Sequence, residues 1–252
     1  MKFEDKVKGL REVKHKGRET SAFLSDVVLM AQGEPYEYLL GEVVFCNTKV
    51  DLSYRPMIPR PETEFWMKSC LSYITNIQKE NLKCLDMFCG SGALGLSFLK
   101  QFPDSFVSFV DKYVPIKEQI ELSLKKNNLD ENRAAIFVED VEYFFCTTKE
   151  VYDVIFAVPP YVDPLCKEDV MRELNREKEL FFFDKEDGFY FHRIILRYGK
   201  NFLTQGGFLC IEFDYTQYEK ITALVHEHGY AVVKKIEDPY GNTTAFILKR
   251  LS

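Results

Sequence analysis

The sequence predicts an α/β fold built on a doubly wound, mostly parallel sheet, and three features of the chain carry that prediction. Short apolar runs alternate with stretches of helical spacing from about residue 83 onward. The first of these runs ends in Asp86 and enters the turn Gly90-Ser91-Gly92, after which a helical pattern begins. The last two runs, 230–237 and 243–249, are separated only by a turn, which predicts an antiparallel hairpin at one edge of the sheet.

Composition narrows the class of protein. The chain has 252 residues, of which 46% are apolar and 22 are Phe, enough to bury a substantial core in one large domain, with or without a small appendage. A formal net charge of −6 argues against broad adhesion to nucleic acid or to an anionic membrane. The seven Cys show no paired CxxC spacing, and no apolar run approaches the roughly 20 residues of a membrane span. These features predict a cytoplasmic protein without a metal site.

The first 57 residues precede the alternating region. Residues 1–32 carry a charge-rich segment followed by apolar residues at helical spacing, which predicts a helical arm ending near Gly33. Residues 33–57 contain two strand-like runs and are expected to form a linking β-hairpin. The main domain is expected over residues 58–252, with Thr63 starting a helix from about residue 64 to residue 77.

The remaining strands and helices follow in regular order. The expected strands cover residues 83–86, 106–111, 135–139, 151–156, 207–213, 230–237 and 243–249. The expected helices cover residues 92–101, 114–127, 141–146, 188–202 and 217–228. A polar insertion, residues 163–184, separates the fourth strand from the helix after it. Strands that alternate with helices in this way predict the doubly wound sheet.

A nucleoside pocket is predicted where two strands end. Gly90 and Gly92 let the backbone turn sharply and approach a ligand closely. Asp111 ends the next strand about 20 residues later, the spacing at which a carboxylate meets a ribose hydroxyl in βαβ units. The alternative is that the glycines only connect strand and helix and that Asp111 only caps the next helix.

A second group of residues follows the fourth strand of the sheet. Val158-Pro159-Pro160-Tyr161 should point into the same crevice as the glycine turn. The two prolines lack N–H donors, so the backbone there can only accept hydrogen bonds, and Tyr161 offers a face for a flat amide or base. The alternative is a proline turn that merely ends the strand.

These segments resemble known methyltransferases. The loop resembles the (Asn/Asp)-Pro-Pro-(Tyr/Phe) motif of enzymes that methylate planar amino groups, and the closing hairpin resembles the seven-stranded, Rossmann-like sheet of class I methyltransferases that use S-adenosyl-L-methionine (SAM). The chain is most similar to the HemK/PrmC family, which methylates the N5 amide nitrogen of a glutamine in peptide-chain release factors. The segments that carry this resemblance are Gly33-Glu34-Pro35-x-x-Tyr38-x-x-Gly41-x-x-x-Phe45, Ile58-Pro59-Arg60-Pro61-Glu62-Thr63-Glu64, Glu186-Asp187-Gly188-Phe189 and Gly206-Gly207-Phe208-Leu209.

The resemblance implies a cofactor site, with S-adenosyl-L-homocysteine (SAH) as the product left there. The implied cofactor-binding residues are Asp86, Phe88, Cys89, Gly90, Ser91, Gly92, Asp111, Asp140 and Val141. Within this set, Phe88–Gly92 would hold the methionine end, Asp111 the ribose, and Asp140 with Val141 the adenine. Capping of the following turn is the alternative role for Asp140.

The resemblance also implies a site for the protein substrate, a release factor, with no membrane and no nucleic acid as partner. The implied substrate-binding residues are Arg60, Pro61, Glu62, Thr63, Val158, Pro159, Pro160 and Tyr161, of which Val158, Pro159 and Tyr161 are the catalytic positions. An ion pair between Arg60 and Glu62 that holds the loop is the alternative to direct contact. His192, His226 and His228 are expected to be structural or exposed.

Two positions depart from the family pattern. Phe88 stands where the family usually has glycine, and Val158 stands where the motif has Asn. Valine cannot accept a hydrogen bond from the substrate amide, and the loss of one such contact costs about 10²–10³ in rate. Catalysis is then weakened, or another acceptor replaces the Asn, or the residue is an introduced substitution; SAM binding should survive in each case. Methylation of a nucleobase amino group on RNA or DNA, or a catalytically silent SAM-binding partner protein, remain as alternative functions.

Overall fold

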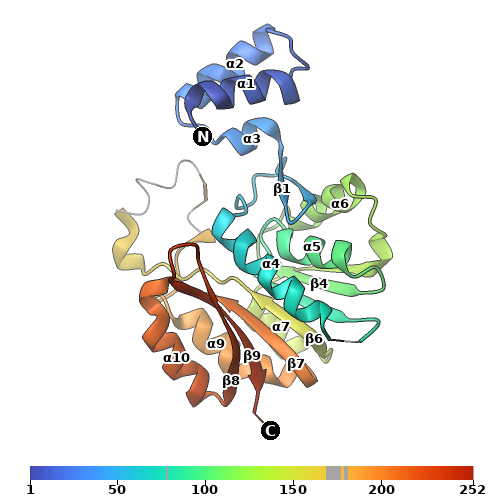
Figure 1. Ribbon diagram of the computed structural model, residues 1–252, viewed down its shortest axis with the longest axis vertical. Coiled ribbons are helices and arrows are strands. Elements are labelled where there is room, and N and C mark those ends of the chain that lie inside the picture. The colour runs from blue at the N-terminus through green and yellow to red at the C-terminus, as the bar shows by residue number, and fades with distance from the viewer. Residues whose placement is uncertain (78, 169–176, 179–180, 252) are drawn as a thin grey trace.

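The computed structural model describes residues 1–77, 79–168, 177–178 and 181–251. The main sheet contains β3 Lys83–Met87, β4 Phe106–Asp111, β5 Ala134–Val138, β6 Tyr152–Ala157, β7 Leu203–Glu212, β8 Tyr230–Glu237 and β9 Thr243–Arg250. Their order across the sheet is β5-β4-β3-β6-β7-β9-β8 (Figure 1). Neighbouring strands are parallel except that β9 is antiparallel to both β7 and β8. The predicted seven-stranded sheet with its C-terminal hairpin is therefore confirmed.

Helices cover both faces of this sheet. One layer contains α4 Pro61–Thr75, α5 Ala93–Gln101 and α6 Ile116–Lys126, and the other contains α7 Val141–Thr147, α9 Tyr190–Gly199 and α10 Tyr218–Glu227. Successive side chains of a strand point to opposite faces, so Cys84 joins the core under α4–α6 while Leu85 joins the core under α7, α9 and α10. Because both faces are covered, the strands read as continuous apolar runs.

The N-terminal region forms a smaller cluster of its own. It contains α1 Phe3–Val13, α2 Ser21–Ala31 and α3 Tyr36–Leu40, and it lies at the top of the molecule in Figure 1. Leu10 and Met30 from the first two helices pack with Tyr36 and Leu39, which belong to the segment predicted as a link. The hairpin of β1 Glu42–Phe45 and β2 Thr48–Asp51 then leads into the main domain.

Among the helices, α4 and α9 differ most from the sequence prediction at their ends. Helix α4 begins at Pro61, and Arg60 rather than Thr63 occupies the N-cap with extended backbone angles. Proline is favoured at the first helical position because its fixed φ suits the helix and its missing N–H would have no partner there. Helix α9 ends at Gly199, so residues 200–202 lie outside it.

Strand β7 starts four residues earlier than predicted because two glycines are accommodated inside it. Gly206 has φ +85°, and a Cβ on Gly207 would lie 3.1 Å from the Asp153 carbonyl oxygen. The pairing of β7 with β6 is irregular between Tyr152 and Val154, as expected where a strand absorbs such a kink.

The predicted polar insertion, residues 163–184, is described only in part. Residues 169–176 and 179–180 lie outside the described residues. At its far end the chain returns to its starting point, since the Val162 N–H donates to the Phe182 carbonyl and the Asp184 N–H donates to the Val162 carbonyl, both at 2.9 Å. The insertion therefore brings Phe181 and Phe182 beside the loop that follows β6. No helix within the described ranges is long and apolar enough to cross a membrane.

Candidate active site

The turn between β3 and α5 is tightly constrained. Phe88, Gly90 and Gly92 have φ of +55°, +51° and +78°, the left-handed region that favours glycine. A Cβ on Gly92 would lie 2.9 Å from the Ile120 side chain, so the turn also needs glycine for space. Asp86 is buried below the turn and accepts the Gly95 N–H at 2.9 Å, which ties the strand to the start of α5. Burial raises the pKa of Asp86 to about 7.

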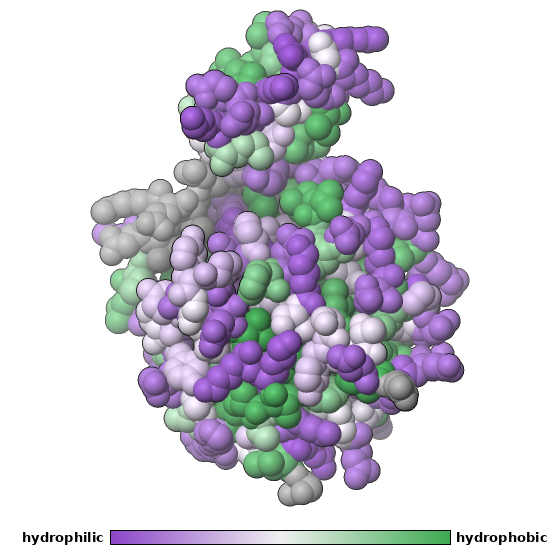
Figure 2. Space-filling view, in the orientation of Figure 1, coloured by the Kyte–Doolittle hydropathy of each residue, from purple (hydrophilic) through white to green (hydrophobic). Residues whose placement is uncertain are grey.

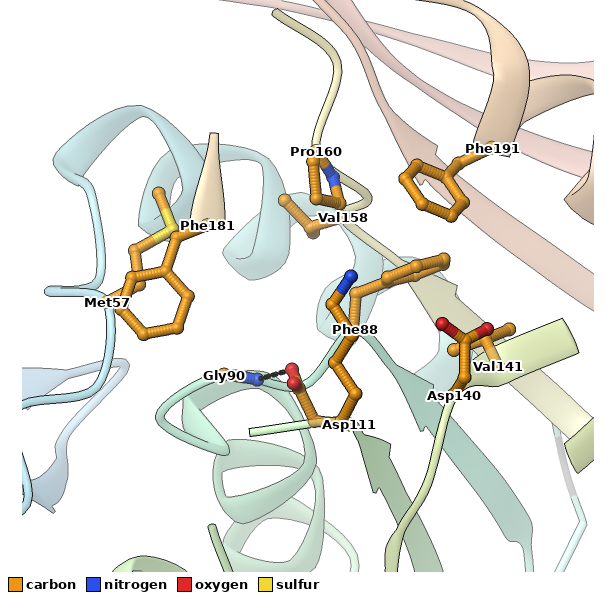
Figure 3. Close-up of a pocket in the computed structure, with 11 residues that line it drawn as sticks. Met57, Phe88, Gly90, Asp111, Asp140, Val141, Val158, Pro160, Phe181 and Phe191 are labelled. Carbon is orange, nitrogen blue, oxygen red and sulfur yellow. Dashed lines mark hydrogen bonds between the residues drawn. The ribbon is translucent and has the colours of Figure 1, made fainter. Parts of the chain in front are cut away.

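Asp111, at the end of β4, holds the same turn from the side. Its Oδ2 accepts the Gly90 N–H at 2.9 Å (Figure 3). Its Oδ1 accepts the Tyr113 N–H, also at 2.9 Å. Burial raises the pKa of Asp111, and the two N–H donors oppose that rise. A carboxylate oxygen can accept more than one hydrogen bond, so Asp111 keeps acceptor capacity toward the cavity it lines.

Two hollows open at the carboxyl ends of β3, β4 and β6. The first, here called the acid hollow, has a volume of about 500 Å³ and is lined by Met57, Phe88, Gly90, Asp111, Lys112, Asp140, Val141, Val158, Pro160, Phe181 and Phe191. The second, here called the turn hollow, has a volume of about 390 Å³ and is lined by Met57, Ile58, Pro59, Arg60, Thr63, Phe88, Cys89, Gly90, Ser91, Ala93, Leu94 and Val158. Four residues line both hollows: Met57, Phe88, Gly90 and Val158.

Most of the predicted site residues face one of these hollows. The acid hollow brings together Phe88, Gly90, Asp111, Asp140, Val141, Val158 and Pro160, and the turn hollow adds Arg60, Thr63, Cys89 and Ser91. The predicted residues that line neither hollow are Asp86, Gly92, Pro61, Glu62, Pro159 and Tyr161. Figure 3 shows Val158 and Pro160 on one side of Phe88 and Asp111 on the other, so the two predicted groups share one cavity.

Tyr161 points away from the hollows toward a buried carboxylate. Its hydroxyl donates to Glu212 Oε1 at 3.2 Å, while Thr63 Oγ1 donates to Glu212 Oε2 at 2.8 Å and Trp66 Nε1 donates to the same oxygen. We call these four residues the Glu212 cluster. Burial raises the pKa of Glu212, which the three donors oppose, and burial beside Glu212 raises the pKa of Tyr161 well above its usual value. The cluster joins the loop after β6 to helix α4.

The loop after β6 is also held from behind. Gln217 Nε2 donates to the Tyr161 carbonyl at 3.1 Å and to the Gly188 carbonyl at 3.0 Å. His192 Nε2 lies 2.9 Å from the Glu212 carbonyl oxygen, and burial lowers the pKa of His192, so the neutral ring donates its N–H there. His192 is therefore a structural residue, as the sequence predicted.

The Arg60–Glu62 pair considered from the sequence is wrong. Arg60 Nη2 instead bonds Glu177 Oε1 at 2.6 Å, and Glu177 Oε2 accepts the Ile58 N–H at 3.0 Å. Glu62 is exposed in the first turn of α4, where its charge suits the helix N-terminus. The buried Glu177 thus fixes the Ile58–Arg60 segment from the polar insertion.

Asp140 caps helix α7, which was the alternative role considered for it, and it also lines the acid hollow. Its Oδ1 accepts the Glu142 N–H at 3.0 Å. Capping and exposure to the cavity are compatible because the second carboxylate oxygen is left over.

Several site residues were missed by sequence reasoning. Glu212 ends a buried strand in the same way as Asp86 and Asp111, so the strand-end rule applied to those two acids would have found it. The insertion supplies Glu177 and Phe181, and α9 supplies Phe191. The local sequence around these residues carries no signal that they lie at the site.

The donor set of the hollows fits an adenosyl group carrying an amino-acid chain. Carboxylate oxygens of Asp111 and Asp140 suit hydroxyl and amino donors, and the apolar Val141, Phe181 and Phe191 suit a flat ring. The turn between β3 and α5, with its left-handed backbone angles, brings the backbone close to the turn hollow. Polar groups are few and apolar walls dominate, as in most small-molecule sites.

Known proteins resemble this chain in sequence. Residues 54–187 match a family described as conserved hypothetical protein 95. The release factor glutamine methyltransferase of Francisella tularensis is 30% identical over 217 residues, which cover 86% of this chain and 74% of that protein. The release factor glutamine methyltransferase of Fusobacterium nucleatum is 26% identical over 219 residues, which cover 86% of this chain but only 60% of that protein. The aligned chain therefore spans less than two thirds of this relative's length.

A solved structure supports the fold. A candidate methyltransferase complexed with SAH matches with a TM-score of 0.60 at 13% identity, covering 83% of this chain and 56% of that one. At this identity the likeness shows the class of fold alone.

Proposed function

Because the chain belongs to the release factor glutamine methyltransferase family, we propose that it transfers a methyl group from SAM to the N5 amide nitrogen of a glutamine in a peptide-chain release factor. One observation carries the proposal: Asp111 and Gly90 line the same acid hollow as Val158 and Pro160 from the loop after β6. A donor and an acceptor held there lie within one water-poor space.

The cofactor side needs no rearrangement of its hydrogen bonds. SAM supplies a methyl group on a positively charged sulfur, which makes that methyl electrophilic. Asp111 is oriented by two backbone N–H groups and retains lone pairs for ribose hydroxyls. Val141, at the start of α7, adds an apolar wall for adenine, and Gly90 lets the backbone approach the methionine end.

The acceptor side has to orient an amide without the motif Asn. Thr63 faces the turn hollow together with Val158, and its hydroxyl proton is already donated to Glu212. The Thr63 oxygen is therefore left as an acceptor, and we assign it the hydrogen bond from the glutamine NH2 that Val158 cannot accept. The backbone carbonyl of Pro159, which the motif resemblance places beside the substrate, supplies the second acceptor.

Apolar side chains in the walls of both hollows would limit the water around a bound donor and acceptor. Met57 and Phe88 line both of them, and Phe181 and Phe191 close the acid hollow. Excluding water strengthens the hydrogen bonds that orient the amide and suppresses attack by water on the methyl donor. The amide nitrogen is a poor nucleophile, so catalysis rests on positioning rather than on a covalent intermediate.

The N-terminal end of the molecule offers a surface on which a protein substrate can dock. A third hollow, of about 1170 Å³, is lined by Met1, by residues of α1, α2 and α3, by residues 33–35, and by Ile58, Arg60 and Glu177. On α2, Leu24 and Val28 are more than half exposed, and Figure 2 shows apolar side chains beside charged ones at this end of the molecule. We therefore assign substrate docking to the helical arm, residues 1–32, together with α3 at the start of the linking segment 33–57, ahead of the methyltransferase domain 58–252.

Transfer of labelled methyl groups to a purified release factor, with an RNA acceptor in parallel, tests this function. We expect label on the release factor only, lost when its acceptor glutamine is replaced. Thr63 replaces only part of the contribution of the motif Asn, so Val158→Asn should still raise the rate, by less than the roughly 10²–10³ that the whole contact is worth. No gain, with a native chain that is already active, would show that Thr63 compensates fully. Label on RNA alone would favour base methylation, and SAM binding without transfer to either acceptor would favour a silent SAM-binding protein.

A further inference from the structure

Phe88 stands out because it adopts a strained conformation in the middle of the site. Its φ of +55° lies in the left-handed region, which costs a residue with a side chain about 1 kcal/mol or more relative to glycine. The neighbouring Gly90 and Gly92 avoid this cost in the same turn. A strained backbone at a residue that lines a cavity indicates that its side chain has a function there.

The ring of Phe88 lies where the two hollows meet. It is one of four residues that line both, and the other three are Met57, Gly90 and Val158. The centroid of the Phe191 ring lies 5.0 Å from that of Phe88, with an interplanar angle of 66°, so the rings meet edge to face. Figure 3 shows Phe88 beside Val158 and above Asp111, with its ring extending toward Phe191.

The connectivity of SAM identifies the atom that belongs at this junction. Adenosine suits the acid hollow, with Asp111 and Asp140, and the methionine chain suits the turn hollow, with Ser91. The sulfur joins these two parts, and it carries the positive charge. None of the four shared residues is a carboxylate, so no formal negative charge among them meets that cation. An aromatic face attracts a cation through its quadrupole, most strongly where water is excluded.

We propose that Phe88 is a cofactor-selectivity residue whose ring face holds the sulfonium of SAM and thereby distinguishes SAM from the uncharged product SAH. The inference rests on the proposed function, since it assumes that SAM binds here. It gives the strained Phe88 a role that a glycine could not fill. It also favours release of the spent cofactor, because the product sulfur has no charge.

Calorimetric titration of the whole chain with SAM and, separately, with SAH tests the proposal. Phe88→Leu keeps a β-carbon in the same strained turn but removes the ring, so it should raise the Kd for SAM about 5–30-fold and change that for SAH less than about 3-fold. Phe191→Leu is the matched control: Phe191 lines only the acid hollow, so SAM and SAH should weaken by equal factors. If Phe88→Leu fails to fold, Phe88→Gly, which relieves the strain, replaces it with the same expected loss of selectivity.

The outcomes separate the two claims. A native chain that binds neither ligand overturns the proposed function and this inference together. A native chain that binds SAM, with SAM and SAH weakened equally in Phe88→Leu or unchanged, overturns the inference alone. Selective loss of SAM affinity in Phe88→Leu but not in Phe191→Leu supports it.

Discussion

The cofactor side and the acceptor side of the site are built in opposite ways. On the cofactor side, Asp111 lines the cavity while backbone N–H groups orient its carboxylate. On the acceptor side, the Glu212 carboxylate is buried behind the loop, and Val158 presents an apolar side chain to the cavity. The first side offers polar groups to a ligand directly, whereas the second uses its polar groups to hold a shape. Ligand contacts and loop position should therefore respond separately to mutation.

Removing the Glu212 carboxylate should have the largest effect. Glu212→Ala leaves the Trp66, Thr63 and Tyr161 donors without their acceptor and should lower the free energy of unfolding by about 3–5 kcal/mol, measured by denaturant titration. Glu212→Gln, which keeps one acceptor oxygen, should lose less. In Glu212→Gln the Kd for SAM should stay within about threefold of the native value. If Glu212→Ala lowers the free energy of unfolding by less than about 1 kcal/mol, the Glu212 cluster does not hold the acceptor side.

Replacing Asp111 should have the reverse effect and act on SAM binding rather than on stability. In Asp111→Asn the NH2 group faces the N–H of Gly90 or of Tyr113, and only the one remaining oxygen can accept. One of the two hydrogen bonds is therefore lost, and the Kd for SAM should rise about 10–100-fold. Asp130→Asn, at an exposed turn far from the site, is the control. Unchanged calorimetric binding in Asp111→Asn would remove Asp111 from the cofactor site.

Asp86 should make stability on the cofactor side depend on pH. Its pKa in the folded chain is about 7, above the usual 3.8. Between these values the folded chain binds a proton that the unfolded chain has lost, so the native free energy of unfolding falls as pH rises through this window. Asp86→Asn, which keeps an acceptor for the Gly95 N–H, should therefore gain about 2 kcal/mol relative to the native chain between pH 5 and 7. A constant difference between the two unfolding curves would contradict the raised pKa.

Thr63 should have the smallest effect, confined to the acceptor. Thr63→Val keeps the shape of the side chain but removes the oxygen assigned to the substrate amide, so the transfer rate should fall about 5–20-fold with little change in the Kd for SAM. Thr63→Ser retains the hydroxyl and should keep most of the rate. Equal methyl-transfer rates in Thr63→Val and Thr63→Ser would mean that another group replaces the motif Asn.

The comparison also explains which features were predictable. Asp111 and Gly90 were found because a strand-end acid and a glycine turn are local signals whose place in the sheet follows from its parallel order. An ion pair of Arg60 with Glu62, two residues away, was the alternative that the sequence left open, but the partner of Arg60 in the fold is Glu177, 117 residues along the chain. Local sequence carries no information on a contact of that separation.

Periodic apolar runs, the glycine turn and the closing hairpin determined the sheet, its helical layers and the edge at which ligands bind, because these patterns act through neighbouring residues. Only the tertiary structure decided that Tyr161 turns from the cavity to Glu212 and that Phe88 stands at the junction of the two hollows. Both outcomes depend on side chains delivered by distant segments, and the packing of those segments selects among rotamers that the local backbone allows equally.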